Sequence, residues 1–184
     1  FLYYFLPAVL VCYFAAPRKL KNAVLFVFSL IFYGWGEPRY IVLMIVSIVS
    51  GFVFALMIEK KQNKKSGLIL MWISVAVSLS FLLIFKYADF LIENVNQLPG
   101  VSLPLSKLSL PIGISFYTFQ IISYTVDVWR GDTKAQRNII SFGTYVSLFP
   151  QLIAGPIVRY TDIERELQER KHSVTLAASG IKRF

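Results

Sequence analysis

The stretch IVLMIVSIVSGFVFALMI, residues 41–58, is a run of 18 residues without a single charge. Only serines and Gly51 interrupt its large apolar side chains. As a helix it would be about 27 Å long, close to the thickness of about 30 Å of a bilayer's hydrocarbon core. The stretch therefore predicts a membrane-spanning helix.

Similar apolar blocks lie on both sides of this stretch. We expect six membrane segments, at residues 1–16, 20–35, 41–58, 68–85, 111–129 and 139–158. The predicted fold class is all-α, a polytopic transmembrane helical protein. The second segment ends in Phe32, Tyr33 and Trp35, which are typical of the aromatic belt at a membrane interface. The fourth continues into residues 86–90, which we expect to extend its helix at the interface.

The composition of the chain agrees with a membrane protein. Of its 184 residues, 56% are apolar and 16% are charged, whereas about 25% are charged in soluble domains. The mean hydropathy is +0.61. These values exclude a disordered chain, a coiled coil and a disulfide scaffold. Cys12, the single cysteine, can form no internal disulfide, and we expect no metal site.

The net charge of +9 could indicate nucleic-acid binding in a soluble protein, but here the basic residues occupy short loops. Loops 17–22, 59–67 and 130–138 hold three, four and three basic residues, and the intervening loops hold one and two. Basic loops stay on the cytoplasmic side of a membrane. We therefore expect these three loops to be cytoplasmic and Phe1 to lie on the opposite side, and we expect no nucleic-acid partner.

One face of the segment 111–129 carries polar side chains. Gln120, Ser123 and Asp127 are spaced i, i+3 and i+7, so they share a helix face. Because hydrocarbon disfavours such groups, this face should point into the protein or toward a water-filled cavity. Two interpretations stay open: a stripe of helix–helix hydrogen bonds in which Asp127 pairs with Arg130, or the lining of a substrate cavity.

The segment 139–158 contains LFPQLIAGPI at residues 148–157. The 11 residues before Pro150 make about 16 Å of helix, which crosses half of a hydrocarbon core. Prolines lack a backbone donor and glycine permits unusual dihedral angles. Broken backbone in a membrane needs protein or a water-filled cavity around it, so we expect a re-entrant segment beside a cavity. The alternative, a kinked spanning helix, would place Arg159 on the other side of the membrane.

Residues 161–171 are predicted to form a short charged amphipathic helix. TDIE at residues 161–164 reads as a capping box, and Ile163 and Leu167 would share the apolar side. Such a helix either rests on the membrane surface or is a solvated structural helix. His172, the one histidine, follows in a polar turn. Without a positioned partner it is expected to be a surface residue rather than a general base.

Three motifs carry a resemblance to a known family: LPIGISFYTFQ at residues 110–120, DVWRG at 127–131 and FPQLIAGPIVRY at 149–160. Together they resemble the membrane-bound O-acyltransferase family, and within it the alginate O-acetyltransferase type. FYGW at 32–35 and FKY at 85–87 also fit that branch in order and spacing.

The resemblance implies a multi-pass enzyme of the cell membrane that O-acetylates hydroxyls of a cell-surface or exported polysaccharide. It implies a funnel that holds a histidine base in a C-terminal half, which we expect beyond Phe184. The chain, residues 1–184, would then be the N-terminal part of one membrane domain, with no catalytic residue of its own. Its possible funnel lining is Gln120, Asp127, Gln151 and Arg159.

The implied partners are the lipid bilayer, a polysaccharide acceptor and extracytoplasmic acetyltransferase proteins. No tightly bound cofactor is expected, and the acyl donor would be acetyl-CoA or an acyl-carrier thioester. Two other functions remain as alternatives. One is D-alanyl transfer to teichoic acid by a related branch. The other is transport or lipid flipping, because proline-broken helices and intramembrane polar groups also mark transporters.

Overall fold

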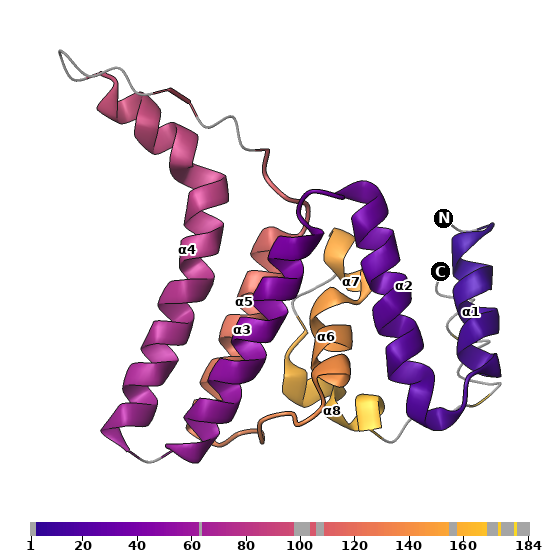
Figure 1. Cartoon of the computed structure of the whole chain (residues 1–184). Helices are drawn as coiled ribbons and strands as arrows, with labels where there is room; N and C mark the ends of the chain where they lie inside the picture. Colours follow the sequence, from indigo (N-terminus) through magenta and orange to yellow (C-terminus); the bar gives the residue numbers. More distant parts are fainter. Residues whose placement is uncertain are drawn as a thin grey trace.

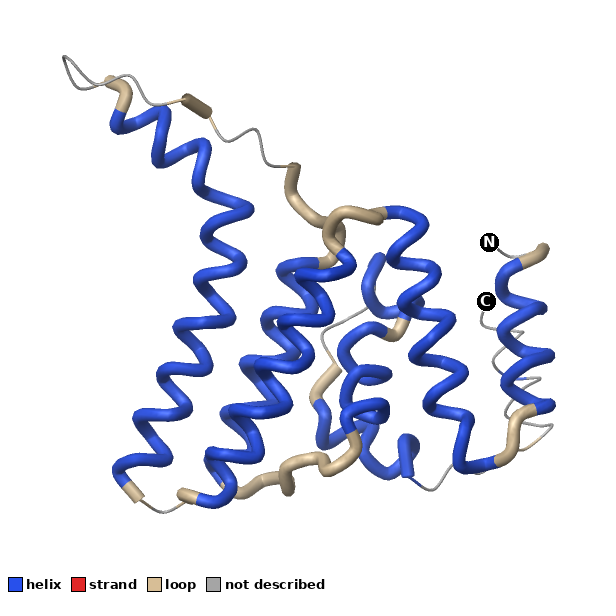
Figure 2. Tube along the Cα trace, in the orientation of Figure 1, coloured by secondary structure: helices blue, strands red, loops and turns tan. Residues whose placement is uncertain are grey.

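In the computed structural model, the described residues are 3–62, 64–97, 104–105, 109–154, 158–168, 173 and 179. Their secondary structure is helical, with no strand among them, as Figure 2 shows. The elements are α1 (Phe5–Ala15), the 3₁₀-helix η1 (Arg18–Leu20), α2 (Lys21–Gly36), α3 (Ile41–Lys60), α4 (Lys65–Val95), α5 (Ile114–Arg130), α6 (Ile139–Ser147), α7 (Phe149–Ala154) and α8 (Tyr160–Gln168). The predicted all-α fold class is confirmed.

Two of the described helices are long and apolar enough to cross a membrane: α3 with 20 residues and α4 with 31. Both present large apolar side chains on the outside of the structure, such as Val42 on α3 and Ile69 and Trp72 on α4. Extended apolar surface of this kind is found where a protein meets a membrane or a partner. The protein is a membrane protein.

α4 is longer than the expected segment 68–85. It runs without a break from Lys65 to Val95, about 46 Å, and so exceeds a hydrocarbon core of about 30 Å. Figure 1 shows its C-terminal part extending beyond the other helices. The helix continues through residues 86–90 because no glycine or proline interrupts the sequence there.

The core lies around α5 and α6. α5 packs against α3 and α4, and α6 packs against α2 and α3. Every residue of α6 from Ser141 to Ser147 is buried. α3 comes close to α5 because Gly51 has no side chain: a Cβ at this position would lie 2.6 Å from Cγ2 of Ile121.

Hydroxyl side chains inside the apolar helices donate to the backbone of their own helix. Ser47, Ser80 and Ser147 each donate to the carbonyl oxygen four residues earlier, at 2.9, 2.7 and 2.8 Å. Such bonds satisfy a hydroxyl without a partner on another helix. This is why serines in the apolar blocks are compatible with membrane helices.

The expected segment 139–158 forms two helices. α6 ends at Ser147 and α7 begins at Phe149, and Leu148 between them has φ −55° and ψ 113°. The interruption therefore precedes Pro150, which lies in the first turn of α7, where a proline removes no helical hydrogen bond. The expected break at Gly155 and Pro156 lies outside the described residues.

After α7 the chain returns to the end of the bundle where α6 begins (Figure 1). The hydroxyl of Tyr145 on α6 donates to the carbonyl oxygen of Val158 at 3.0 Å. The hydroxyl of Tyr160 accepts from Nε2 of Gln136, which precedes α6, at 2.8 Å. The chain thus turns back toward the end where α6 begins, which is the course expected for a re-entrant segment. A kinked spanning helix would place Tyr160 at the opposite end.

α8 begins at Tyr160, so the prediction of a capping box at residues 161–164 is wrong in its position. Thr161 lies inside the first turn, and the N–H of Asp162 donates to the carbonyl oxygen of Arg159 at 3.2 Å. The reason is tertiary packing. Tyr160 is fully buried against aromatic rings of α5 and α6, which draws the helix start one residue earlier.

The apolar side of α8, expected on the membrane surface or on a solvated helix, faces the core. Ile163 and Leu167 pack against the buried cluster, and Nδ2 of Asn22 donates to the carbonyl oxygen of Leu167 at 3.1 Å. α8 is therefore attached to the bundle. Residues 169–172, with the predicted end of this helix and His172, lie outside the described residues.

The three basic loops of the sequence analysis gather at one end of the molecule (Figure 1). Nδ2 of Asn22, the last residue of the first loop, donates to Oγ of Ser141 at the start of α6, at 2.9 Å. Nε2 of Gln62 in the second loop donates to the carbonyl oxygen of Val128 at the end of α5, at 3.2 Å. We call this the basic end of the bundle.

Candidate functional site

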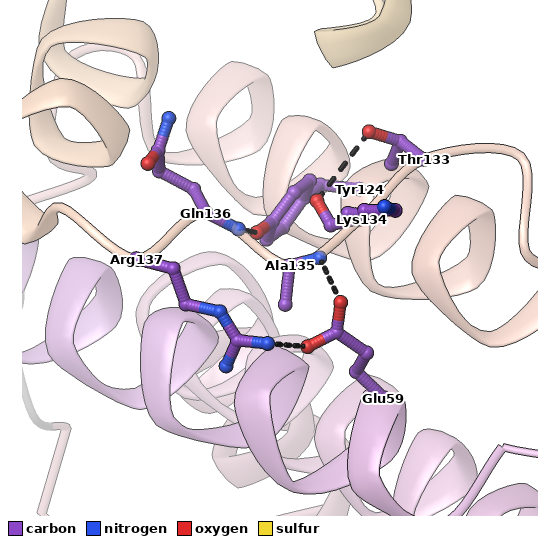
Figure 3. A network of polar contacts seen from close by, with 7 residues as sticks. All are labelled: Glu59, Tyr124, Thr133, Lys134, Ala135, Gln136 and Arg137. Carbon is purple, nitrogen blue, oxygen red and sulfur yellow. Dashed lines mark hydrogen bonds and ion pairs between the residues drawn. The ribbon is translucent and has the colours of Figure 1, made fainter.

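Polar contacts from α3 and α5 fix the loop between α5 and α6, as Figure 3 shows. The hydroxyl of Tyr124 accepts from the backbone N–H of Gln136 at 2.7 Å. The carboxylate of Glu59 accepts from the N–H of Ala135 at 3.1 Å and pairs with the guanidinium of Arg137. The loop is thereby held in one position relative to α3 and α5.

The same loop determines where α6 and α8 begin. Asn138 is the N-cap of α6, and its side-chain oxygen accepts from the N–H groups of Ile140 and Ser141 at 2.9 and 3.4 Å. Oγ1 of Thr133 donates to the carboxylate of Glu164 on α8 at 2.9 Å. Both ends of the re-entrant segment are therefore anchored to one loop.

Tyr160 lies where α8 meets this loop. Burial raises the pKa of Tyr160 to about 12, although the hydrogen bond from Gln136 acts in the opposite direction. The phenol is therefore protonated at neutral pH.

Asp127 is a buried carboxylic acid near the basic end of α5. Among the described residues its Oδ2 has no hydrogen-bond partner, and Asp127 forms no ion pair with Arg130, the partner proposed in one of the two interpretations. Arg159 and Arg130 lie within electrostatic reach of the carboxyl group. The exposed Arg159, directly before α8, is thus one of the charged groups near Asp127.

The polar face of α5 points into the protein, as its spacing predicts. Gln120 and Asp127 are buried and Ser123 is half-buried. Gln120 lies seven residues before Asp127, about 10 Å along the helix toward the middle of the bundle. Burial of this face is expected both for helix–helix packing and for the lining of a substrate cavity.

An apolar pocket lies at the opposite end of the bundle, where α2 ends and α5 begins. Its volume is about 350 Å³, and its lining residues are Phe32, Tyr33, Trp35, Gly36, Glu37, Ile112 and Leu152. The predicted aromatic belt is wrong for Tyr33, which is turned inward and buried, whereas Trp35 is 80% exposed. Packing of α2 against α6 decides this difference.

Gly113 shapes one wall of this pocket. Gly113 has φ +76°, a left-handed conformation that glycine adopts readily. It precedes the first residue of α5, Ile114, so the helix begins three residues later than the predicted residue 111. A Cβ at Gly113 would lie 3.2 Å from the carbonyl oxygen of Leu152 on α7. Glycine therefore lets the start of α5 approach α7.

Three buried polar atoms in this part of the bundle have no hydrogen-bond partner among the described residues: the hydroxyls of Tyr33 and Tyr117 and Nε2 of Gln151. The two hydroxyls lie close to each other. An unsatisfied buried polar group costs about 1–3 kcal/mol. Such atoms are informative at a pocket because a bound polar molecule would satisfy them.

The four predicted lining residues do not converge on one point. Asp127 and Arg159 lie at the basic end, Gln151 is on α7 toward the opposite end, and Gln120 lies between. None of the four lines the apolar pocket. Tyr117 lies within the motif at residues 110–120, but the sequence pattern did not predict a role for it.

No group of histidine, cysteine and acidic side chains suited to a metal ion occurs among the described residues. Glu59 is directed toward the loop before α6, where it pairs with Arg137 and accepts from the N–H of Ala135.

The fold and these sites define an all-α membrane protein with a re-entrant segment. The chain is 37% identical over its whole length to the probable alginate O-acetylase AlgI of Pseudomonas aeruginosa, of which it covers 36%. It is likewise 37% identical to the probable alginate O-acetylase AlgI of Azotobacter vinelandii, of which it covers 38%. It is 27% identical over 94% of its length to the peptidoglycan O-acetyltransferase of Helicobacter pylori, of which it covers 38%.

These similarities support the resemblance of the chain to the membrane-bound O-acyltransferase family, on its alginate O-acetylase-like branch. It spans little more than a third of the length of the curated relatives that it matches. No family model matches the chain. No solved structure shows significant similarity to it.

Proposed function

We propose that the whole protein containing this chain transfers acetyl groups to hydroxyls of a cell-surface or exported polysaccharide. The observation that carries this proposal is the 37% identity, over the whole chain, to probable alginate O-acetylases. A second relative bears the name of a peptidoglycan O-acetyltransferase, so acetyl transfer is the shared element of these names. They do not favour D-alanyl transfer or transport.

The reaction needs little more than a base and a shaped cavity. The sugar hydroxyl attacks the acetyl carbonyl, a C–O bond forms, the bond to the donor's leaving group breaks, and the hydroxyl proton passes to the base. We assign the base to a histidine outside this chain, as the family resemblance implies. The donor would be acetyl-CoA or an acyl-carrier thioester, which binds as a substrate and not as a resident cofactor.

This chain would contribute walls of the reaction cavity. The proposed lining is Gln120, Asp127, Gln151 and Arg159, and the apolar pocket extends it at the opposite end. The support is the set of buried, unpaired polar atoms on Tyr33, Tyr117, Asp127 and Gln151. Unpaired groups in a low-dielectric interior are costly unless a substrate or the remaining protein pairs with them.

The proposed topology is multi-pass, with loops 17–22, 59–67 and 130–138 in the cytoplasm. Support comes from the basic end, where these loops gather, since one membrane side must hold all three. The donor would then reach the cavity from the basic end and the polysaccharide from the other. Extracytoplasmic acetyltransferase proteins would take part on the polysaccharide side.

Deletion of the full-length gene in its host tests this function. We expect loss of O-acetyl esters from the exported polysaccharide, measured by proton NMR, with restoration by the intact gene. D-alanyl esters of the envelope are measured in the same cells as the control. Unchanged O-acetylation, or a loss confined to D-alanyl esters, would contradict the proposal.

A further inference from the structure

A second pocket lies at the basic end of the bundle, between the start of α4 and the end of α5. Its volume is about 500 Å³, and it is lined by Lys64, Lys65, Leu68, Trp129 and Arg130. We call it the basic pocket. Its residues come from two places in the sequence that lie about 65 positions apart, so only the packing of α4 against α5 creates it.

The charges of the basic pocket are all positive. Lys64, Lys65 and Arg130 are exposed, and within the described residues none of them forms an ion pair. The buried Asp127 lies within electrostatic reach of Arg130 but forms no ion pair with it. Three cations around one cavity, none of them in an ion pair with another described residue, favour an anion there.

The backbone carbonyl oxygens at the basic pocket are hydrogen-bonded, which reduces their repulsion of an anion. The end of a helix exposes carbonyl oxygens that repel anions. At the end of α5, however, the carbonyl oxygens of Val128 and Trp129 accept from Nε2 of Gln62, at 3.2 and 3.4 Å. Gly131, with φ +85°, leaves room for this amide, because a Cβ there would lie 2.6 Å from Nε2.

The other side of the basic pocket is apolar. Leu68 and the half-buried Trp129 complete the lining. Beyond Leu68, α4 continues with Ile69 and Trp72, which are 58% and 62% exposed. A tryptophan and basic side chains at the end of apolar helices are the usual residues of a membrane–water interface.

We propose that the basic pocket binds the phosphate head group of an anionic phospholipid, with its acyl chains lying along the exposed apolar side of α4. The three cations would contact the phosphate, and Trp129 would lie at the level of the glycerol. The exposed apolar side chains of Leu68, Ile69 and Trp72 favour a lipid over free phosphate, because phosphate has no apolar part that could contact them. Basic pockets between membrane helices bind head groups in this way.

The test uses the purified full-length protein, with bound lipid counted by native mass spectrometry. The probes are phosphatidylglycerol and phosphatidylcholine with identical acyl chains. The variant Lys64→Gln/Lys65→Gln/Arg130→Gln is compared with Arg18→Gln/Lys19→Gln/Lys134→Gln, which removes the same charge from exposed positions elsewhere. Each basic residue that contacts the anionic head group contributes about a fivefold effect. We therefore expect phosphatidylglycerol affinity to fall about 100-fold in the pocket variant and to stay nearly unchanged in the control.

Two arms separate the lipid from other anions. Inorganic phosphate and acetyl-CoA are each titrated as competitors of bound phosphatidylglycerol. The proposal would be overturned if the two triple variants lost phosphatidylglycerol affinity to the same extent. It would also be overturned if the pocket variant lost only the binding of phosphate or of acetyl-CoA. Lys64→Gln/Lys65→Gln serves if the triple variant does not fold, with about a 25-fold loss expected. Because the readout is lipid binding, the outcome is independent of acetyl transfer.

Discussion

The hydroxyl of Tyr124 accepts a hydrogen bond from the backbone N–H of Gln136 at 2.7 Å, in a place where the tyrosine is fully buried. About two turns of helix earlier, Tyr117 is equally buried, but its hydroxyl has no hydrogen-bond partner among the described residues. The two tyrosines of α5 therefore have opposite roles. One holds a loop, and the other keeps a polar atom unpaired beside the apolar pocket.

Replacing each tyrosine by phenylalanine should separate these roles. Tyr124→Phe removes the acceptor of a buried N–H, so we expect a loss of about 1–3 kcal/mol in the free energy of unfolding. Tyr117→Phe and Tyr33→Phe remove hydroxyls that make no hydrogen bond, and we expect no loss or a small gain. Unfolding of the full-length protein in detergent, followed by tryptophan fluorescence, measures the difference. Equal destabilisation by all three would contradict the assignment.

Gly51 should tolerate no side chain. Gly51→Ala brings a Cβ within 2.6 Å of Cγ2 of Ile121, which is itself buried. Overpacking of this kind costs about 1–3 kcal/mol. The matched control is Gly36→Ala on α2, where a Cβ would meet nothing within 4 Å. We expect thermal unfolding at a lower temperature for the first variant and no decrease for the second, and a harmless Gly51→Ala would show that α3 and α5 are not closely packed.

The two contacts of Glu59 should differ in strength. Arg137 is 66% exposed, so its ion pair with Glu59 is worth at most about 1 kcal/mol. Glu59→Ala also removes the acceptor of the N–H of the buried Ala135, for a total of about 1–3 kcal/mol. Chemical unfolding at low and high salt checks this. High salt should abolish most of the effect of Arg137→Gln and leave most of the effect of Glu59→Ala.

Arg159 provides a test of the proposed lining. It is exposed, so Arg159→Gln should change stability by less than about 0.5 kcal/mol. If its guanidinium faces substrate beside Asp127, the loss of a charged hydrogen bond should lower acetylation of the polysaccharide by about tenfold or more. Arg165→Gln, at an exposed position on α8, is the matched control and should keep full activity. Wild-type acetylation by Arg159→Gln would remove this residue from the lining.

Much of the helical architecture was predictable because hydrophobic length is a local property. The uncharged run at 41–58 lies within α3, and the interval between Gln120 and Asp127 placed both on the buried face of α5. The boundaries were less predictable. α4 continues to Val95 because lysine, aspartate and glutamate are acceptable in a helix that has left the apolar block.

What the sequence alone determined is the class of the protein, since membrane length, uncharged runs and the family motifs are all read along the chain. Only the tertiary structure decided that Tyr33 turns inward beside Tyr117, that the segment after α6 returns to its own end, and that Lys64 and Arg130 share a pocket. The physical reason is that these relations join residues far apart in sequence. They depend on which helix faces pack together, and a pattern along one helix identifies a buried face without identifying its neighbour.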